Sequence, residues 1–369
     1  MMGWRRLAVR LGISLAVALL PAATFADDIR LLTGPQQTSQ HRVGGELAAR
    51  LGPAVDIPLT VVPTAGPADI LQRMRDDTRA GGGLNLALLQ ADVAQLYLLT
   101  AQGGNREAAA WLAPLRVVAP LYNEELHFIV RSDSAFESVQ DIREARINVG
   151  PAAGGTALSV ATLYRLLFDT LPAADKLSRL GHEQALARLL TDRSIDVVAM
   201  LADQPAPLLA NMKPEARRFV RLLKFDREHP TAAVISRVYG ASALRAASYP
   251  NLLEQDVPAL TVRLYLVVHG EPEGEDAQRL RRLAGAYCQA LPKLRSDGHP
   301  KWRDTAPGLP ALVPGWHYSD RGTPELARCL GVAANEIPDA CLPLEQALGL
   351  CRANVTVVAP ATAAADAPR

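Results

Sequence analysis

The chain is 369 residues long, and 49% of its residues are hydrophobic, which supplies enough apolar surface for more than one core. Its 39 lysines and arginines nearly balance its 38 aspartates and glutamates, and no basic stripe follows the sequence. This balance argues against a nucleic-acid partner. The length predicts two lobes rather than one small domain.

The N-terminal 26 residues have the three parts of an export signal. Three arginines in the first ten residues provide the positive start, residues 11–20 are the apolar core, and small residues lead to a predicted cleavage before Asp27. The apolar run is too short to span a bilayer, and no later stretch is long enough. An uncleaved membrane anchor is the alternative. Removal of residues 1–26 leaves about 343 residues with a net charge of about −2.

Short apolar runs alternate with helical patterns along most of the chain. Each of the first three runs is followed by a helix, which predicts a mostly parallel sheet covered on both faces. Without an internal repeat or a glycine/serine linker, we expect strands to join the two lobes. The predicted strands are residues 29–32, 59–62, 86–89, 115–120, 126–130, 147–149, 195–200, 219–223 and 260–268. The predicted helices cover residues 39–51, 67–80, 93–97, 138–142, 156–167, 186–190 and 280–291, and a further one opens at 203–205.

A glycine-rich turn at residues 146–156 is the most informative local feature. Its sequence, Arg-Ile-Asn-Val-Gly-Pro-Ala-Ala-Gly-Gly-Thr, predicts a buried strand, a turn and a helix start. Gly154 and Gly155 let a guest approach the backbone, and Thr156 can cap the helix. The first amide groups of that helix have no internal partner and lie at its positive end, so they favour a carboxylate or phosphate. The alternative is an ordinary strand-to-helix turn.

Four further turns carry polar residues or glycine at the ends of predicted strands: residues 33–39, 64–67, 90–92 and 202–205. In open α/β sheets, ligands sit beyond the carboxyl ends of the strands and near helix starts. These turns therefore predict a cleft between the lobes, although each also has a purely structural interpretation.

All four cysteines lie in the last quarter of the chain: Cys288, Cys329, Cys341 and Cys351. An even number in an exported protein suggests disulfides, and four cysteines allow three connectivities. We expect a bond within the 329–351 cluster. Zinc is the weaker interpretation because no Cys-x-x-Cys pair or nearby histidine pair is present. The alanine-rich segment 358–369 predicts a disordered tail.

Three segments together resemble the TAXI class of solute-binding proteins of TRAP transporters. They are Leu-Ala-Leu-Leu-Gln-Ala-Asp-Val at 86–93, Leu-Tyr-Asn-Glu-Glu-Leu-His at 121–127, and Asn-Val-Gly-Pro-Ala-Ala-Gly-Gly-Thr at 148–156. The resemblance runs from about residue 31 to about residue 319. It implies an α/β fold of two lobes with hinge strands, the type II periplasmic binding protein fold, followed here by a C-terminal cysteine-containing extension.

The resemblance also implies a function. Such a protein is periplasmic, binds a small anionic solute, often a dicarboxylate or an acidic amino acid, and passes it to a TRAP-type membrane permease. By position, the implied ligand contacts are Thr33, Gly34, Ser39, Gly66, Gln90, Asp92, Tyr122, Gly154, Gly155 and Thr156. Gln40 and His41 stand where the family has tyrosines, and Arg42 is either a carboxylate clamp or a solvated side chain.

The same resemblance divides the chain into parts. We expect residues 27–122 and 232–300 to form lobe one, and residues 123–231 to form lobe two. Residues 301–357 are expected to pack on lobe one as the C-terminal extension. We expect the protein to be a monomer that needs no cofactor or metal.

The sequence leaves two other function classes as alternatives. The same lobes could report a ligand to a membrane sensor kinase instead of a permease. An enzyme is disfavoured because the seven histidines are scattered and no nucleophile elbow, phosphate loop or dinucleotide motif occurs. Glu124 and Glu125 are adjacent on a strand, so they point to opposite faces, and Asp203 is expected to cap a helix.

Overall fold

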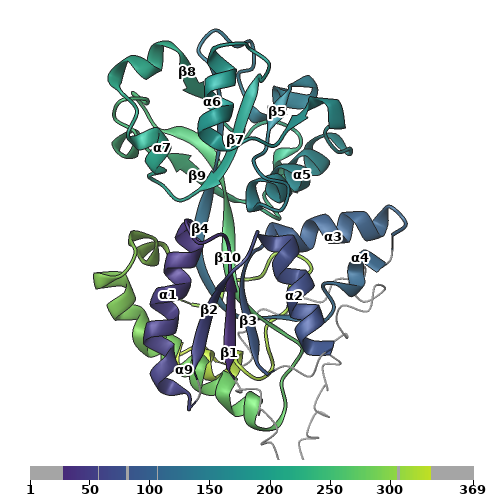
Figure 1. Ribbon diagram of the computed structural model, residues 1–369, viewed down its shortest axis with the longest axis vertical. Coiled ribbons are helices and arrows are strands. Elements are labelled where there is room, and N and C mark those ends of the chain that lie inside the picture. Colours follow the sequence, from purple (N-terminus) through teal and green to yellow (C-terminus); the bar gives the residue numbers. More distant parts are fainter. Residues whose placement is uncertain (1–27, 57, 80–82, 106, 306–307, 334–369) are drawn as a thin grey trace, which may run out of the picture.

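The computed structural model describes residues 28–56, 58–79, 83–105, 107–305 and 308–333. Within these residues a ten-stranded sheet runs through the whole molecule, with the order β2-β1-β3-β10-β4-β7-β5-β6. In addition, β8 pairs with β4 and β9 pairs with β10. Figure 1 shows two lobes, one above the other, that share β4 and β10. The predicted two-lobed α/β fold with hinge strands, that of the type II periplasmic binding proteins, is therefore confirmed.

Lobe one begins with three parallel strands, and each carries a helix at its carboxyl end. All six residues of β3 are buried, as expected of a strand covered on both faces. In α1, the Thr38 side chain accepts a hydrogen bond from the His41 amide and so caps the helix. The strands are β1 (Ile29–Thr33), β2 (Leu59–Pro63) and β3 (Asn85–Gln90). The helices are α1 (Ser39–Leu51), α2 (Pro67–Arg79), α3 (Asp92–Gln102) and α4 (Glu107–Ala110).

Two long antiparallel strands, β4 (Leu115–Arg131) and β10 (Val257–His269), connect the lobes. The prediction of two strands at 115–120 and 126–130 was wrong, because the polar residues between them stay extended and pair with β10. Glu124 lies opposite Val262 in this pairing, and Glu125 lies opposite Thr261. The polar residues in the middle of β4 therefore lie where the chain passes from one lobe to the other.

Lobe two is built on the far halves of the two connecting strands. Its core consists of two apolar clusters, and residues of the segment 232–262 belong to both of them. The chain thus returns to lobe one within β10 and not at residue 232, because Ile235, Tyr239 and Leu244 bury their side chains in lobe two. The strands are β5 (Ile147–Asn148), β6 (Leu177–Ser178), β7 (Val197–Ala202), β8 (Val220–Leu222) and β9 (Gly240–Leu244). The helices are α5 (Gly155–Phe168), α6 (His182–Leu190), α7 (Pro207–Ala210) and α8 (Ala232–Ile235), and the helix expected at 138–142 is a 3-10 helix, Val139–Glu144.

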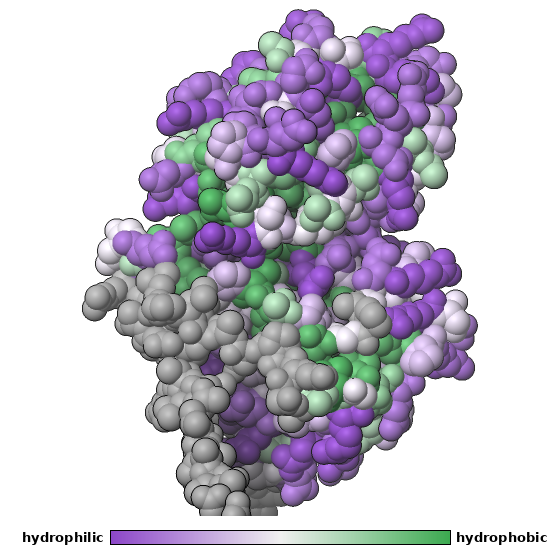
Figure 2. All heavy atoms as spheres, turned by 180° about the vertical axis from the view of Figure 1, so that it is seen from behind, coloured by the Kyte–Doolittle hydropathy of each residue, from purple (hydrophilic) through white to green (hydrophobic). Residues whose placement is uncertain are grey.

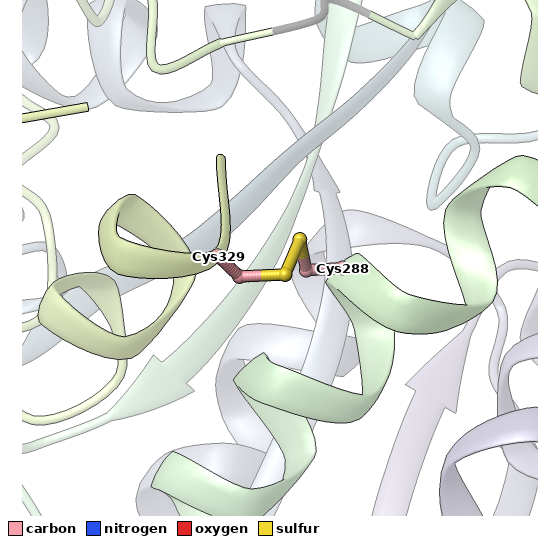
Figure 3. Close-up of a disulfide and its surroundings, with 2 residues drawn as sticks. All are labelled: Cys288 and Cys329. Atoms are coloured by element: carbon pink, nitrogen blue, oxygen red, sulfur yellow. A yellow bond between two sulfur atoms is a disulfide. The ribbon is translucent and has the colours of Figure 1, made fainter. Parts of the chain in front are cut away.

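The chain ends, as far as it is described, on lobe one. Helix α9 (Gly274–Asp297) packs against α1, and α10 (Thr323–Leu330) packs against α9. A disulfide between Cys288 and Cys329 joins these two helices (Figure 3). The expected bond within the 329–351 cluster was therefore wrong for Cys329, because α10 packs against α9, which carries Cys288. Cys341, Cys351, the predicted export signal and the alanine-rich tail lie outside the described residues.

Polar side chains dominate lobe two on the face seen from behind. Hydrophilic side chains cover most of lobe two there, and hydrophobic ones show along the waist between the lobes (Figure 2). Over the described ranges, no helix has the length and apolar character that a membrane crossing requires.

Candidate functional site

The two lobes contact each other through the turns at the ends of their strands. A Cβ atom on Gly66, in the turn after β2, would lie 2.0 Å from the carbonyl oxygen of Ala153 in lobe two. A Cβ atom on Gly155, the first residue of α5, would lie 2.7 Å from Nε2 of Gln90 at the end of β3. Gly66 also has a φ of +135°, which an L side chain rarely adopts. Glycine is therefore required at Gly66 for the lobes to meet as they do.

Glu124 is the polar centre of this contact. Its side chain is buried between the lobes and accepts hydrogen bonds from Nε2 of Gln40, at 3.2 and 3.4 Å, and from Nε2 of Gln90, at 3.1 Å. Burial raises the pKa of Glu124 to about 8, and the charge of Asp203 raises it further, while the two amides act in the opposite direction. Near pH 7 this carboxyl group is therefore mainly protonated.

Asp203, in the turn after β7, faces the same region from lobe two. Its side chain is only 9% exposed, and neither carboxylate oxygen has a hydrogen-bond partner in the described part of the chain. Nε2 of His299 lies 3.8 Å from Oδ2. Burial raises the pKa of Asp203, and the Ser39 hydroxyl and the charges of Lys301 and His299 counteract this effect. The expectation that Asp203 caps a helix was wrong, because Ala206 precedes α7 and has no side-chain cap.

Glu125 belongs to a different cluster. Nζ of Lys301 lies 2.7 and 2.9 Å from its two oxygens and also donates to Asp304 at 3.1 Å. Lys301 and Glu125 are both almost completely buried. As expected for neighbours on a strand, the two glutamates have different partners, so Lys301 neutralises Glu125 and leaves Glu124 with amide donors alone.

Most of the ten ligand contacts implied by the resemblance lie at or beside this polar centre. The Thr33 hydroxyl lies 2.9 Å from Nδ1 of His41, and Gly34 lies against Oε1 of Gln40. Ser39, Gly66, Gln90 and Gly155 lie where the lobes meet. Tyr122 is fully buried in the core of lobe one, and its hydroxyl has no hydrogen-bond partner among the described residues.

The other three expected contacts make contacts within the protein. Gly154 precedes α5, and its Cα atom would lie 3.2 Å from a Cβ atom added to Gly66. Oγ1 of Thr156 accepts a hydrogen bond from the Leu201 amide at 3.0 Å, so this residue anchors α5 to β7 and does not cap the helix. Asp92 starts α3 and accepts a hydrogen bond from the Tyr239 hydroxyl of lobe two at 3.0 Å. Asp92 thus makes a direct contact between the lobes.

Asp92 is fully buried in that contact. Its Oδ1 atom has no partner among the described residues, and the single proton of the Tyr239 hydroxyl is shared between Oδ2 of Asp92 and the carbonyl oxygen of Ser159, each 3.0 Å away. Burial raises the pKa of Asp92 to about 6, against the lowering effect of Ser159 and Tyr239. The contact is therefore sensitive to pH in the mildly acidic range.

The sequence did not single out Glu124, Asp203, His299 or Lys301 as site residues. For Glu124 a signal existed, since it is a charged residue between two apolar runs of a strand that is buried along most of its length. Asp203 was visible only as a polar residue in a strand-end turn. His299 and Lys301 lie far along the chain and reach the site only through the packing of the segment after α9.

A hollow lies between α3 and α5, away from Glu124. It has a volume of about 510 Å³ and a largely apolar lining that includes Leu96, Tyr97, Trp111 and Leu158, together with Arg179. The guanidinium of Arg75 lies 3.5 Å from the centre of the Trp111 ring. Within the described ranges, no group of three or more histidine, cysteine or acidic side chains could hold a metal ion.

Several solved structures are distantly similar to this chain. The periplasmic sulfonate-binding protein SsuA from Methylobacillus flagellatus is 12% identical, and the match covers 88% of this chain and 84% of that one, with a TM-score of 0.44. A TctC solute-binding protein from Polaromonas is 14% identical over 84% and 98%, with a TM-score of 0.40. The arginine-, lysine-, histidine-binding protein ArtJ from Geobacillus stearothermophilus is 8% identical over 74% and 94%, with a TM-score of 0.42. Scores this low carry no argument about ligand or partner.

The family assignment comes from the sequence itself. The model of the NMT1-like family matches residues 31–295, which include both lobes and both connecting strands. The protein therefore belongs to the NMT1-like family.

Proposed function

We propose that the protein is a periplasmic solute-binding receptor of the TAXI class. It would capture a small organic solute with at least one carboxylate, a dicarboxylate or an acidic amino acid, and deliver it to a TRAP-type membrane permease. The observation that carries this proposal is the convergence of buried polar side chains from both lobes where the connecting strands pass between them. Gln40, Gln90 and Glu124 meet there with Asp203 of lobe two.

Binding would use the motion that two connecting strands permit. Rotation about β4 and β10 would open the contact at Gly66 and Gly155, admit the solute and close again. The solute's carboxylate would lie at the N-terminus of α5, a helix of 14 residues whose first amide groups are free to donate. The Ser39 hydroxyl and the Gln90 amide would complete its hydrogen bonds from lobe one.

Delivery to a permease fits the other features of the chain. The export signal over residues 1–26 would place the mature protein in the periplasm, where the Cys288–Cys329 disulfide is stable. The TAXI-like segments at 86–93, 121–127 and 148–156 lie at the strand ends and connecting strands that build the contact between the lobes. A monomer is sufficient for this role, because each chain has both of the lobes that would enclose the solute.

The proposal is tested by thermal unfolding of the mature protein, residues 27–369, with succinate, fumarate, glutarate, aspartate and glutamate. A bound solute at 100 times its Kd stabilises the fold by about 2.7 kcal/mol, which raises the melting temperature measurably. Gln90→Ala should abolish the shift, whereas Gln184→Ala, an exposed glutamine on α6, should leave it unchanged. No shift with any of these solutes would overturn the proposal.

A further inference from the structure

The contact between the lobes contains several buried hydrogen-bond acceptors that have no partner among the described residues. Both oxygens of Asp203 and Oε1 of Gln90 are buried and have no partner in the described part of the chain. Glu124 receives only the amide groups of Gln40 and Gln90. A buried acceptor without a donor is unfavourable, so these atoms call for a ligand that brings donors of its own.

The charges around Glu124 and Asp203 are also unbalanced. Lys301 is committed to Glu125 and Asp304, and Glu46 accepts hydrogen bonds from the His299 amide and from Trp302. Burial lowers the pKa of His299, so the ring is mainly neutral near pH 7.

Arg42 is an exposed cation beside the contact between the lobes. Its guanidinium lies 3.4 Å from Oγ of Ser39 and 3.5 Å from Nε2 of His299. Among the described residues, neither Glu124 nor Asp203 forms an ion pair with a lysine or arginine, although the charges of Lys301 and Arg42 lower the pKa of Asp203 from a distance. No lysine or arginine is therefore in direct contact with the two carboxyl groups.

We propose that Glu124 and Asp203 form a subsite for a positively charged nitrogen of the solute, a primary ammonium or an amidinium group. This inference rests on the proposed function, because it assigns one end of the solute that the lobes enclose. Three donors of an ammonium group would satisfy acceptors on Glu124, Asp203 and Gln90, from the middle of β4, from lobe two and from lobe one respectively. A dicarboxylate would bring only acceptors to the same place.

The number of protons released on binding distinguishes a cationic group of the solute from an anionic one. The pKa of Glu124 is raised to about 8 by burial and by Asp203, so near pH 7 its carboxyl group is mainly protonated. The other groups that face the pair are Tyr122, Ser39, Arg42, His299 and Lys301. A bound ammonium favours the ionised carboxylate, and the proton of Glu124 leaves to the buffer. A bound carboxylate favours the protonated form and causes no release.

The test is isothermal titration calorimetry with matched solutes, glutamate against glutarate and aspartate against succinate, at pH 7 in phosphate and in Tris. The amino-bearing member of a pair should bind at least tenfold more tightly. Its binding should release up to about one proton, so the heat is more exothermic in Tris than in phosphate. Affinity should rise between pH 6 and pH 8, because an increasing fraction of Glu124 is ionised over this range.

Variants assign the effect to the two residues. Glu124→Gln keeps the size and burial of the side chain, and it should weaken the amino-bearing solute at least tenfold and abolish the proton release. Asp203→Asn should weaken binding by a similar factor. Glu215→Gln, on an exposed residue with no role in the cleft, is the matched control and should change neither quantity. Melting curves of all variants without solute show whether each one is folded.

The outcomes separate this inference from the function on which it rests. If glutarate or succinate binds as tightly as its amino counterpart, or if binding takes up protons, the subsite is overturned and the receptor function stands. Unchanged affinity in folded Glu124→Gln and Asp203→Asn proteins has the same meaning. If none of the four solutes binds, the proposed function fails and the subsite fails with it.

Discussion

At the scale of single residues, Asp92 shows how a buried carboxyl group couples the lobes to pH. Its pKa in the folded protein is raised from 3.8 to about 6 by burial. The folded state therefore binds the Asp92 proton more tightly than the unfolded state does. The stabilisation that this proton provides is complete below pH 4 and is lost as the pH rises through 6. The loss amounts to about 3 kcal/mol, since one pKa unit corresponds to about 1.4 kcal/mol.

Asp92→Asn should remove this pH dependence, because the amide carries no charge at any pH. Relative to the original protein, the variant's free energy of unfolding should rise by up to about 3 kcal/mol between pH 4 and pH 7.5. Urea denaturation at four pH values measures it. Asp196→Asn is the control of opposite sign, because hydrogen bonds from Arg146 lower the pKa of Asp196. If the free energies of unfolding of Asp92→Asn and of the original protein differ by the same amount at every pH, the prediction is contradicted.

At the scale of elements, the strand β4 is held from outside the sheet by the segment that follows α9. Lys301 lies in the 3-10 helix Pro300–Asp304 and forms a buried ion pair with Glu125 in the middle of β4. Burial raises the pKa of Glu125 despite this partner, which means that the pair compensates only part of its desolvation. The segment after α9 is thus coupled to the strand about which the lobes would rotate.

Lys301→Met should lower the free energy of unfolding by about 3–5 kcal/mol, because it leaves Glu125 buried without a cation. The double variant with Glu125→Gln should recover most of that loss. Denaturation in urea measures both. Arg217→Met, which breaks the exposed pair with Glu254, is the control and should change stability by less than about 1 kcal/mol. An equal loss in the Lys301→Met single and double variants would show that the ion pair is not the cause.

Comparison of the predicted and observed elements shows which helices and strands can be predicted from local sequence patterns. The strands β1, β3 and β10 and the helices α1, α2, α5 and α9 follow directly from apolar periodicity, because each has a buried face, and the half-buried strand β2 follows from its short apolar run. Periodicity could not show that β4 is one strand, since its polar middle is stabilised by pairing with β10 some 140 residues later. The short strand β9 was missed because its sequence, Gly-Ala-Ser-Ala-Leu, has little strand propensity.

At the scale of the whole molecule, the same distinction applies to the site. The turns with Thr33, Gly66, Gln90 and Gly155 could be located from sequence, because the carboxyl ends of parallel strands gather at one edge of a sheet. The partners of Glu124 and Glu125 on β4 could not be located from the sequence. Gln40 meets Glu124 across 84 residues and Lys301 meets Glu125 across 176, and no local pattern records such a contact.

The closed arrangement of the lobes depends on Gly66 more directly than on any polar contact. A Cβ atom there would lie 2.0 Å from the Ala153 carbonyl oxygen, and this backbone atom cannot move aside unless lobe two moves with it. Gly66→Ala should therefore hold the lobes apart. Its radius of gyration in small-angle X-ray scattering should exceed that of the original protein, and its affinity for any enclosed solute should fall at least tenfold.

Strain in the glycine's own backbone has to be separated from this effect, since Gly66 has a φ of +135°. Gly104 has a similar φ of +106°, but a Cβ atom added there meets nothing within 4 Å. Gly104→Ala should therefore lose stability for the same backbone reason while the lobes stay closed and the affinity stays unchanged. If the two variants give equal radii of gyration and equal affinities, Gly66 does not control closure, and the turn after β2 serves only its own lobe.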